Sequence, residues 1–299
     1  FKSGGCSWSK CRMCSYRHER YSGSQSPGTI LEHLRAQLSW VSHQYKTEEY
    51  RMVKIFTSGS FFDPEEVPAE FLPEVATAFR GKLVIAETRP EFVNPDLLRS
   101  FLELLDDGSY EKPLYCAIGL ETSSDSIREK SINKGFSFQD FKNASAAAHR
   151  AGAGVKAYLL LKPLFLTEAE SVSDMKRSVR DTIPYAEMIS MNPCTVQRNT
   201  EMEYYWKRGA YRPPYLWSVL SVLSDAPFHV TCDPVGGGQK RGPHNCGACD
   251  YEIVRGIRDY SLNADRDLIC ALLETRCGCR QEWEYILASE KSYCMPLTR

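Results

Sequence analysis

The sequence predicts an α/β fold: a partial (β/α)6-type TIM barrel with a small cysteine-rich metal-binding module at its C-terminal end. From residue 27 onward, short apolar runs alternate with amphipathic segments, and no hairpin turn signal joins one run to the next. Repeated units of this kind form a parallel sheet with right-handed crossovers. Beyond Cys232 the alternation gives way to a loop rich in glycine, proline and cysteine, and then to a helix from about residue 250. We therefore expect a barrel domain over residues 1–225 and a metal-binding module over residues 226–299.

The helices are expected from the spacing of their apolar residues and from signals at their ends. The first carries apolar side chains at Ile30, Leu34 and Leu38, which is the spacing of a buried helix face. Asn94 followed by Pro95 is typical of an N-cap and a first helical residue. In chain order, the expected helices begin near residue 29, cover 69–79, follow 94 as far as 108, lie between 137 and 152, and begin at 167.

The expected strands are the apolar runs, and each of them ends beside polar residues. They cover 52–56, 82–87, 115–120, 155–161 and 188–191, with a further candidate at 228–231. We also expect the natural N-terminus to be trimmed and one earlier strand to be missing. In β/α barrels, functional residues lie where the carboxyl ends of the strands meet the loops. The polar residues at those positions are Thr57, Ser58, Glu87, Arg89, Glu121, Lys162 and Asn192.

Composition excludes several classes of protein. The 299 residues carry a formal charge of −1, so a globally basic nucleic-acid binder is excluded, and any RNA contact must come from a local patch or a partner. No apolar run approaches the roughly twenty residues that span a bilayer, and no membrane association is expected. Most of the twelve cysteines lie within 6–14 and 232–279. Clusters at metal-ligand spacing favour a reducing cytoplasm over a disulfide framework.

A cysteine triad stands near the start of the chain. Cys6, Cys11 and Cys14 have the spacing C-x4-C-x2-C, and the next cysteine is Cys116, inside an apolar run. Three thiolates in one short loop suit an iron–sulfur cluster, and three ligands on four irons leave one iron open. A zinc turn completed by His18 and a plant-type ferredoxin loop are the alternatives, although a ferredoxin has a fourth cysteine nearby.

A second set of cysteines lies near the C-terminal end. It comprises Cys232, Cys246, Cys249, Cys277 and Cys279. A Cys-x2-Cys knuckle with one cysteine before it and a pair after it is typical of a closed zinc site with four thiolates. A second iron–sulfur cluster is the alternative, because thiolates alone do not choose between these metals. The spacing does not decide which of the last two cysteines completes the site.

The polar residues at the strand ends have two interpretations each. The loop at Thr57 and Ser58 could bind the amino or carboxylate group of a ligand, or could be an ordinary βα loop. Glu87 and Arg89 share one face of a strand, so they could hold a polar ligand or pair with each other. Glu121 could accept hydrogen bonds from ribose hydroxyls or cap the next helix.

Aromatic and basic residues interleave between 204 and 217, and Lys240 and Arg241 lie beside the second cysteine set. Cationic side chains next to aromatic rings could bind a nucleic-acid base that is flipped out of its helix, together with the neighbouring phosphates. Helix packing with cations reaching the solvent is the simpler interpretation. The basic residues concerned are Lys207, Arg208, Arg212, Lys240 and Arg241.

Together these features resemble radical S-adenosylmethionine (SAM) enzymes of the branch related to the Elongator catalytic subunit. The resemblance rests on the triad, the β/α order and the Glu-Thr-Arg-Pro run at 87–90. Within that branch, the chain is similar to the archaeal radical SAM enzymes of archaeosine synthesis over nearly its whole length. The most specific parts are Tyr-Arg-Pro-Pro at 211–214 and Cys-Asp-Pro-Val-Gly-Gly-Gly at 232–238, and further parts lie at 5–8, 57–61, 155–163 and 192–198.

This resemblance implies a mechanism. A [4Fe–4S] cluster on Cys6, Cys11 and Cys14 would bind SAM at its open iron and cleave it reductively to methionine and a 5′-deoxyadenosyl radical. The implied substrate is a tRNA whose D-arm carries a 7-deazaguanine, already joined to lysine by the lysine-transferring subunit of archaeosine synthase. Cleavage of a C–N bond then leaves the formamidine group of archaeosine, so the enzyme would be a lyase. An electron donor such as ferredoxin is implied as a further partner.

The same resemblance implies roles for individual residues. Thr57, Ser58, Glu87, Arg89 and Glu121 would position SAM. Lys156, Lys162, Asn192 and Gln197 would face the lysyl substrate. Two alternative functions stay open: a radical SAM enzyme that acts on a peptide or a small molecule, and a non-catalytic RNA-binding module stabilised by iron–sulfur or zinc.

Overall fold

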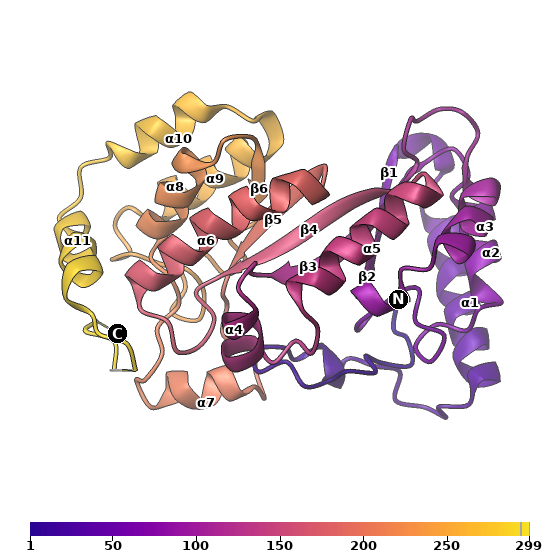
Figure 1. Ribbon diagram of the computed structural model, residues 1–299, viewed down its shortest axis with the longest axis horizontal. Coiled ribbons are helices and arrows are strands. Elements are labelled where there is room, and N and C mark those ends of the chain that lie inside the picture. The colour runs from indigo at the N-terminus through magenta and orange to yellow at the C-terminus, as the bar shows by residue number, and fades with distance from the viewer. Residues whose placement is uncertain (294, 299) are drawn as a thin grey trace.

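The computed structural model describes residues 1–293 and 295–298. Its strands form one six-stranded parallel sheet in the order β1-β2-β3-β4-β5-β6, and the sheet curves into a half-barrel (Figure 1). The strands are β1 (Met52–Ile55), β2 (Leu83–Thr88), β3 (Leu114–Glu121), β4 (Gly154–Leu161), β5 (Met188–Pro193) and β6 (Val230–Cys232). The predicted order and orientation of the strands are therefore confirmed. The strand expected before the chain lies outside the described residues.

Helices alternate with the strands as predicted. They are α1 (Pro27–Gln44), α2 (Phe71–Ala78), α3 (Pro95–Leu105), α4 (Asp125–Ile127), α5 (Phe138–Ala151), α6 (Glu168–Thr182), α7 (Glu201–Lys207), α8 (Leu216–Asp225), α9 (Asp250–Asn263), α10 (Arg266–Leu273) and α11 (Cys279–Ser289). Most of the end signals act as expected, although α3 ends at Leu105 and does not reach 108. The Asn94 side chain caps α3, Ser137 forms a capping box with Asp140, and Gly152 ends α5 in the left-handed conformation at a φ of 89°.

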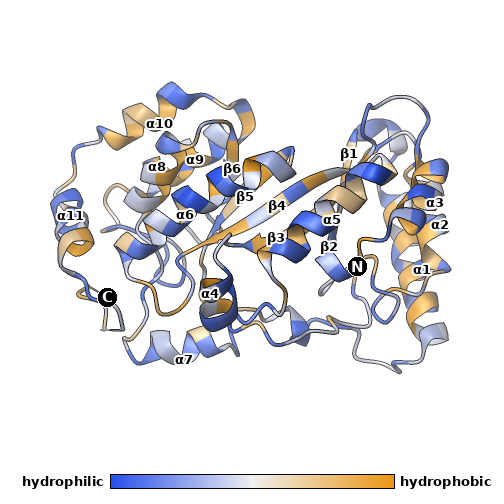
Figure 2. Cartoon of the chain, in the orientation of Figure 1, coloured by the Kyte–Doolittle hydropathy of each residue, from blue (hydrophilic) through white to orange (hydrophobic). Residues whose placement is uncertain are grey.

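The two faces of the sheet differ in chemistry. The face beneath the helices is made of buried aliphatic residues such as Val84, Ile118 and Leu159, as expected for a sheet covered by crossover helices. These residues belong to one hydrophobic core that extends from α1 to α11, and the hydropathy colours in Figure 2 show apolar patches on both the strands and the helices. The opposite, inner face of the half-barrel carries polar side chains, which are described below.

The C-terminal segment packs directly on the barrel. The expected boundary at 225/226 falls between α8 and β6, yet β6 pairs with β5 and extends the sheet. The Ser261 hydroxyl on α9 donates a 2.7 Å hydrogen bond to the Cys232 carbonyl on β6. On α11, the Trp283 indole donates a 2.8 Å bond to the Ser218 hydroxyl of α8. The division into two domains remains a proposal. None of the helices among the described residues has the length and apolar character needed to cross a membrane.

Candidate active site at the mouth of the half-barrel

The N-terminal cysteine loop is fixed on one side to the segment that follows β3. The Trp8 indole donates a 2.7 Å hydrogen bond to the Asn133 carbonyl. The Arg12 amide donates a 2.9 Å bond to the Ile132 carbonyl. Because this segment leaves the carboxyl end of β3, the loop lies over the end of the barrel where active sites of this architecture form.

The other side of the cysteine loop is fixed to the segment that follows β5. Arg12 forms a 2.6 Å ion pair with Glu201 at the start of α7. The Gln197 side-chain oxygen accepts a 2.7 Å bond from the Ser15 amide, one residue beyond Cys14. The cysteine loop therefore bridges the mouth between β3 and β5.

The three thiols of the loop are partly buried. Burial raises the pKa of Cys11 to about 11 and also raises that of Cys14. A bound metal cation stabilises thiolates and therefore lowers the pKa of the thiols that bind it. Among the described residues, the three sulfur atoms do not form a group within 4.8 Å of one another. Tetrahedral zinc holds its sulfurs about 3.8 Å apart, so the triad fits a larger iron–sulfur cluster better than a single ion.

The loop after β1 lies against this cysteine loop. A β-carbon added at Gly59 would stand 2.7 Å from the Cys6 sulfur, so only glycine fits at this position. The loop owes its shape to Glu66, whose fully buried carboxylate accepts bonds from the Gly59 amide at 2.9 Å and the Ser60 amide at 2.6 Å. Thr57 and Ser58 lie in the same loop. Sequence reasoning missed Glu66, because nothing in its local pattern separates it from a surface glutamate.

Glu87 and Arg89 do not pair with each other. Arg89 forms a 2.6 Å ion pair with Glu91, donates a 3.0 Å bond to the Lys134 carbonyl, and lies 5.3 Å from the Trp8 ring. Arg89 therefore supports the cysteine loop through its contact with Trp8. Glu87 is half-buried, and the desolvation of its carboxyl group raises its pKa to about 7.

Glu121 ends β3 with a change of direction. It has a φ of 68°, and the register with β4 shifts between Gly119 and Glu121. Its carboxylate forms a 2.6 Å ion pair with Lys134. The Lys134 ammonium also interacts with the Cys11 thiol, and the negative charges of Glu121 and Cys11 raise the pKa of Lys134. Lys134 is a second residue that sequence reasoning did not single out, since the contact spans thirteen residues.

The inner face of the sheet brings several predicted residues into one row. Glu87 on β2 is in register with Ala117 on β3, which is in register with Lys156 on β4. Tyr158 and Ser190 follow on the same face of β4 and β5, because side chains two apart on a strand point the same way. Asn192 lies two residues beyond Ser190, and Lys54 occupies the equivalent face of β1.

Lys156 is the cation at the centre of this row. Its side chain lies 5.1 Å from the Tyr158 ring. Burial, and after it the like charge of Lys54, lower its pKa to about 8. An acid with a pKa near 7 and an amine with a pKa near 8 on one enclosed face are groups that can exchange protons close to neutral pH.

Lys162 and Gln197 are placed differently from Lys156 and Asn192. Lys162 leaves β4 at a φ of 61°, and its ammonium forms a 2.5 Å ion pair with Glu168, both side chains being almost fully buried. Glu168 also accepts a 2.8 Å bond from the Tyr215 amide. Gln197 holds the backbone at Ser15, as described above. This placement favours a structural role for Lys162 and a loop-anchoring role for Gln197.

A second group of thiols lies near the C-terminal end of the chain. The sulfur atoms of Cys246, Cys249, Cys277 and Cys279 are all within 4.8 Å of one another. The distances are 3.5 Å for 246–277, 3.6 Å for 249–279 and 3.4 Å for 277–279. The Trp217 indole donates a 3.2 Å bond to the Cys279 sulfur. Both members of the last cysteine pair thus join the group.

Cys232 corrects the predicted ligand set. It lies on β6 in the hydrophobic core, where its amide donates a 2.8 Å bond to the Ser261 hydroxyl. It does not belong to the group of four sulfur atoms. Its place before the Cys-x2-Cys knuckle predicts a ligand, but this cysteine ends a buried strand.

Comparisons with known proteins agree with this arrangement. No family model matches the chain. The chain is 43% identical to archaeosine synthase subunit beta of Methanosarcina acetivorans, over 97% of the chain and 84% of that protein. It is 37% identical to archaeosine synthase subunit beta of Thermococcus kodakarensis, over 93% of the chain and 86% of that protein.

Solved structures give the fold. Elp3 of Methanocaldococcus infernus matches with a TM-score of 0.51 at 17% identity, covering 80% of this chain and 59% of that one. Methylornithine synthase matches with a TM-score of 0.52 at 18% identity, covering 76% of this chain and 60% of that one. These likenesses confirm the expected partial β/α barrel.

Proposed function

The chain belongs to the archaeosine synthase subunit beta family, and we propose that it cleaves the C–N bond of a lysine-modified 7-deazaguanine in the D-arm of tRNA, giving archaeosine. The enzyme class would be a radical SAM lyase. The observation that carries the proposal is the position of the cysteine loop, which bridges the mouth of a half-barrel whose inner face is polar. A [4Fe–4S] cluster on this loop, with SAM, would supply an electron and a 5′-deoxyadenosyl radical directed at that face.

The proposal assigns roles in SAM binding and substrate binding to residues of the chain. Thr57 and Ser58, in the loop whose Gly59 lies against Cys6, offer hydroxyl and backbone groups to the amino and carboxylate ends of SAM. Glu87 and Glu121 offer acceptors to its ribose and amino groups, while Arg89 holds the loop from beneath. Lys156 and Asn192 line the inner face where the lysyl chain would lie. The curved sheet and its loops would exclude water from the reactive groups.

The four C-terminal thiols support a structural zinc ion as the second metal. Tetrahedral zinc with Zn–S bonds of about 2.3 Å holds its sulfurs about 3.8 Å apart. The sulfur–sulfur separations of 3.4–3.6 Å in the structure are close to this value. A second iron–sulfur cluster would need wider spacing, because each sulfur binds a different iron. The indole and amide donors at Trp217 and Asn245 suit thiolates, whose charge they would stabilise.

Three partners follow from the proposal. The first is tRNA, and the second is the lysine-transferring subunit of archaeosine synthase, consistent with the designation of the relatives as beta subunits. The third is an electron donor such as ferredoxin. A cavity of about 230 Å³ beside Cys6 is lined by Arg17 and Arg20 together with Glu65, and the excess of positive charge there suits an acidic donor. A cytoplasmic location is part of the same proposal.

Nucleoside analysis tests the proposed reaction. Lysine-modified tRNA is incubated with the reconstituted enzyme, SAM and a reductant, and the digested tRNA is examined by mass spectrometry. The proposal expects conversion of the lysine adduct to archaeosine. Cleavage of SAM without change in the tRNA would favour a peptide or small-molecule substrate, and binding of tRNA without either change would favour the non-catalytic module.

A further inference from the structure

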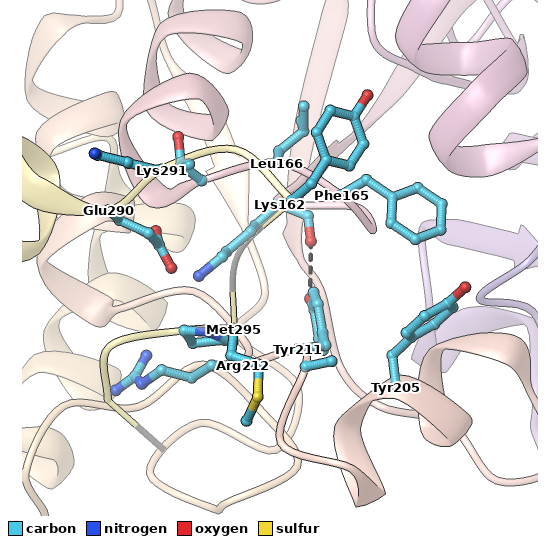
Figure 3. Close-up of a pocket in the computed structure, with 13 residues that line it drawn as sticks. Lys162, Phe165, Leu166, Tyr205, Tyr211, Arg212, Glu290, Lys291 and Met295 are labelled. Atoms are coloured by element: carbon cyan, nitrogen blue, oxygen red, sulfur yellow. Dashed lines mark hydrogen bonds between the residues drawn. The ribbon is translucent and has the colours of Figure 1, made fainter.

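A second cavity lies between the carboxyl end of β4 and the segment after α11. Its volume is about 240 Å³, below the roughly 300–1,000 Å³ of pockets that enclose a whole drug-sized ligand, so it suits one substituent of a larger molecule. Figure 3 shows Lys162 and Arg212 among the side chains around it. Aromatic residues form one wall, and the segment after α11 forms the cover: Phe165, Tyr205, Tyr211, then Glu290, Lys291, Tyr293, Met295 and Pro296.

Arg212 is a buried cation in the lining of this cavity. Its exposed fraction is only 4%. Two of its nitrogens donate to backbone carbonyls, at 2.7 Å to Pro213 and 2.8 Å to His244, while its Nε has no hydrogen-bond partner. Within residues 1–293 and 295–298, no carboxylate forms an ion pair with it. A buried charge without a counter-charge is costly, and an anion that enters the cavity would remove that cost.

The other charges near the cavity are already engaged or lie at its rim. The Lys162 ammonium is neutralised by Glu168 at 2.5 Å. The Glu290 carboxylate accepts a 2.7 Å bond from the Glu168 amide at the start of α6. Lys291 is exposed at the entrance. Glu290 keeps its negative charge in the lining. Among the described residues, the buried cation without an ion-pair partner is Arg212, whose guanidinium carbon lies 3.5 Å from the centroid of the Tyr215 ring.

The cavity adjoins the proposed active site through its aromatic wall. The Arg12 guanidinium, in the cysteine loop, lies 5.9 Å from the Phe165 ring, and Phe165 meets Tyr205 edge to face at 5.3 Å. One side of Phe165 thus faces the cysteine loop, and the residue also lines the cavity. A base that stacks on such rings would bring its attached anionic group within reach of Arg212.

We propose that this cavity is a subsite for an anionic oxygen group of the RNA substrate, which the Arg212 guanidinium binds. The inference rests on the proposed function. Two groups share this chemistry: the α-carboxylate of the lysine attached to the base, and a backbone phosphodiester. Both accept hydrogen bonds from a guanidinium in the geometry that arginine prefers.

Equilibrium binding without reductant tests the subsite separately from catalysis. Affinity is measured for lysine-modified tRNA and for the same tRNA without the modification, each at several KCl concentrations. The proteins are wild type, Arg212→Gln, Lys291→Glu, which keeps Arg212 but adds a negative charge at the entrance, and Arg150→Gln. Arg150 is exposed in the last turn of α5, at the opposite end of the barrel, and serves as the matched control.

We expect Arg212→Gln to weaken binding about tenfold or more, Lys291→Glu to act in the same direction, and Arg150→Gln to have no effect. A loss confined to the lysine-modified tRNA identifies the carboxylate. An equal loss for both tRNAs, with a salt slope reduced by about one, identifies a phosphate. Unchanged affinity in folded Arg212→Gln overturns the subsite, and if that variant does not fold, unchanged affinity in Lys291→Glu does so. Wild-type protein that binds neither tRNA contradicts both the subsite and the proposed function, whereas binding without turnover contradicts the function alone.

Discussion

Single residues on the inner face of the sheet have acid–base properties that the fold imposes. Glu87 and Lys156 lie in one register row, and burial brings the pKa of the first up to about 7 and that of the second down to about 8. The sequence indicated Glu87 as a polar group at a strand end, and the family resemblance implied Lys156 as a residue facing the substrate. It could not indicate the shifts, because these depend on neighbours contributed by other strands and by Lys134.

The pH dependence of stability tests the environment of Glu87. A carboxyl group whose pKa is raised from 4.5 to about 7 favours folding most below pH 4.5, and this contribution, up to about 3 kcal/mol, is lost as the pH rises through 7. In Glu87→Gln the free energy of unfolding should therefore fall less between pH 5 and pH 8 than in wild type. Urea unfolding at several pH values measures the difference. Parallel curves for the two proteins would show that Glu87 is solvated like a surface residue.

The buried pair of Lys162 and Glu168 gives a second prediction. Lys162→Met leaves an unpaired carboxylate in a dry site and should lower the free energy of unfolding by about 3–5 kcal/mol. Lys156→Met, on the inner face, should retain stability but lose activity if Lys156 meets the substrate. The two variants are compared by urea unfolding and by archaeosine formation. A stable but inactive Lys162→Met protein would return Lys162 to the substrate-facing set.

At the scale of elements, the structure was predictable where the signals are local. The caps at Asn94, Ser137 and Thr167 and the stop at Gly152 mark helix ends through contacts within a few residues. The short strand β6 was only a candidate, since three residues carry little periodicity. Glu66 and the partners of the cysteine loop were not predictable, because they act on backbone groups that only the folded chain brings near.

The cysteine loop should depend on its anchors. Gln197→Ala removes the acceptor for the Ser15 amide beside Cys14, and outer contacts of this kind typically affect metal affinity 10- to 100-fold. We expect the variant to lose iron at least tenfold faster than wild type when a chelator is added anaerobically, as followed by absorbance. Gln139→Ala, exposed on α5, is the control and should lose iron at the wild-type rate. Equal rates in all three proteins would remove Gln197 from the supporting contacts.

The C-terminal group of thiols should hold zinc independently of iron. Cys277→Ser should reduce bound zinc from about one ion per chain to near zero, leave the iron content unchanged, and destabilise α9 to α11, since a structural zinc site contributes folding free energy. Elemental analysis and protease sensitivity of the C-terminal segment measure these effects. Cys232→Ala and Cys270→Ser are the controls. Loss of zinc in Cys232→Ala would restore that cysteine to the ligand set, and iron in place of zinc at the four thiols would identify a second cluster.

For the whole molecule, the arrangement of its parts is compatible with the proposed action of a nearly neutral chain on RNA. The cysteine loop and the cavity at Arg212 both lie at the carboxyl ends of the strands, next to the polar inner face of the sheet. The half-barrel is open along its sheet edges, so a partner or a large substrate can approach the mouth from the side. The fold class was predictable from the β/α alternation, whereas the meeting of the C-terminal segment with the mouth was not, since it joins residues more than a hundred positions apart.

The most direct test of the central claim is the formation of 5′-deoxyadenosine. Cluster-reconstituted protein is incubated with SAM under anaerobic reducing conditions, with lysine-modified tRNA, with unmodified tRNA and without tRNA, and Cys14→Ala serves as the control. The account predicts that 5′-deoxyadenosine forms only when Cys14 is present and that its yield rises with the lysine-modified tRNA. Formation indifferent to tRNA, or none from a fully loaded cluster, would contradict it.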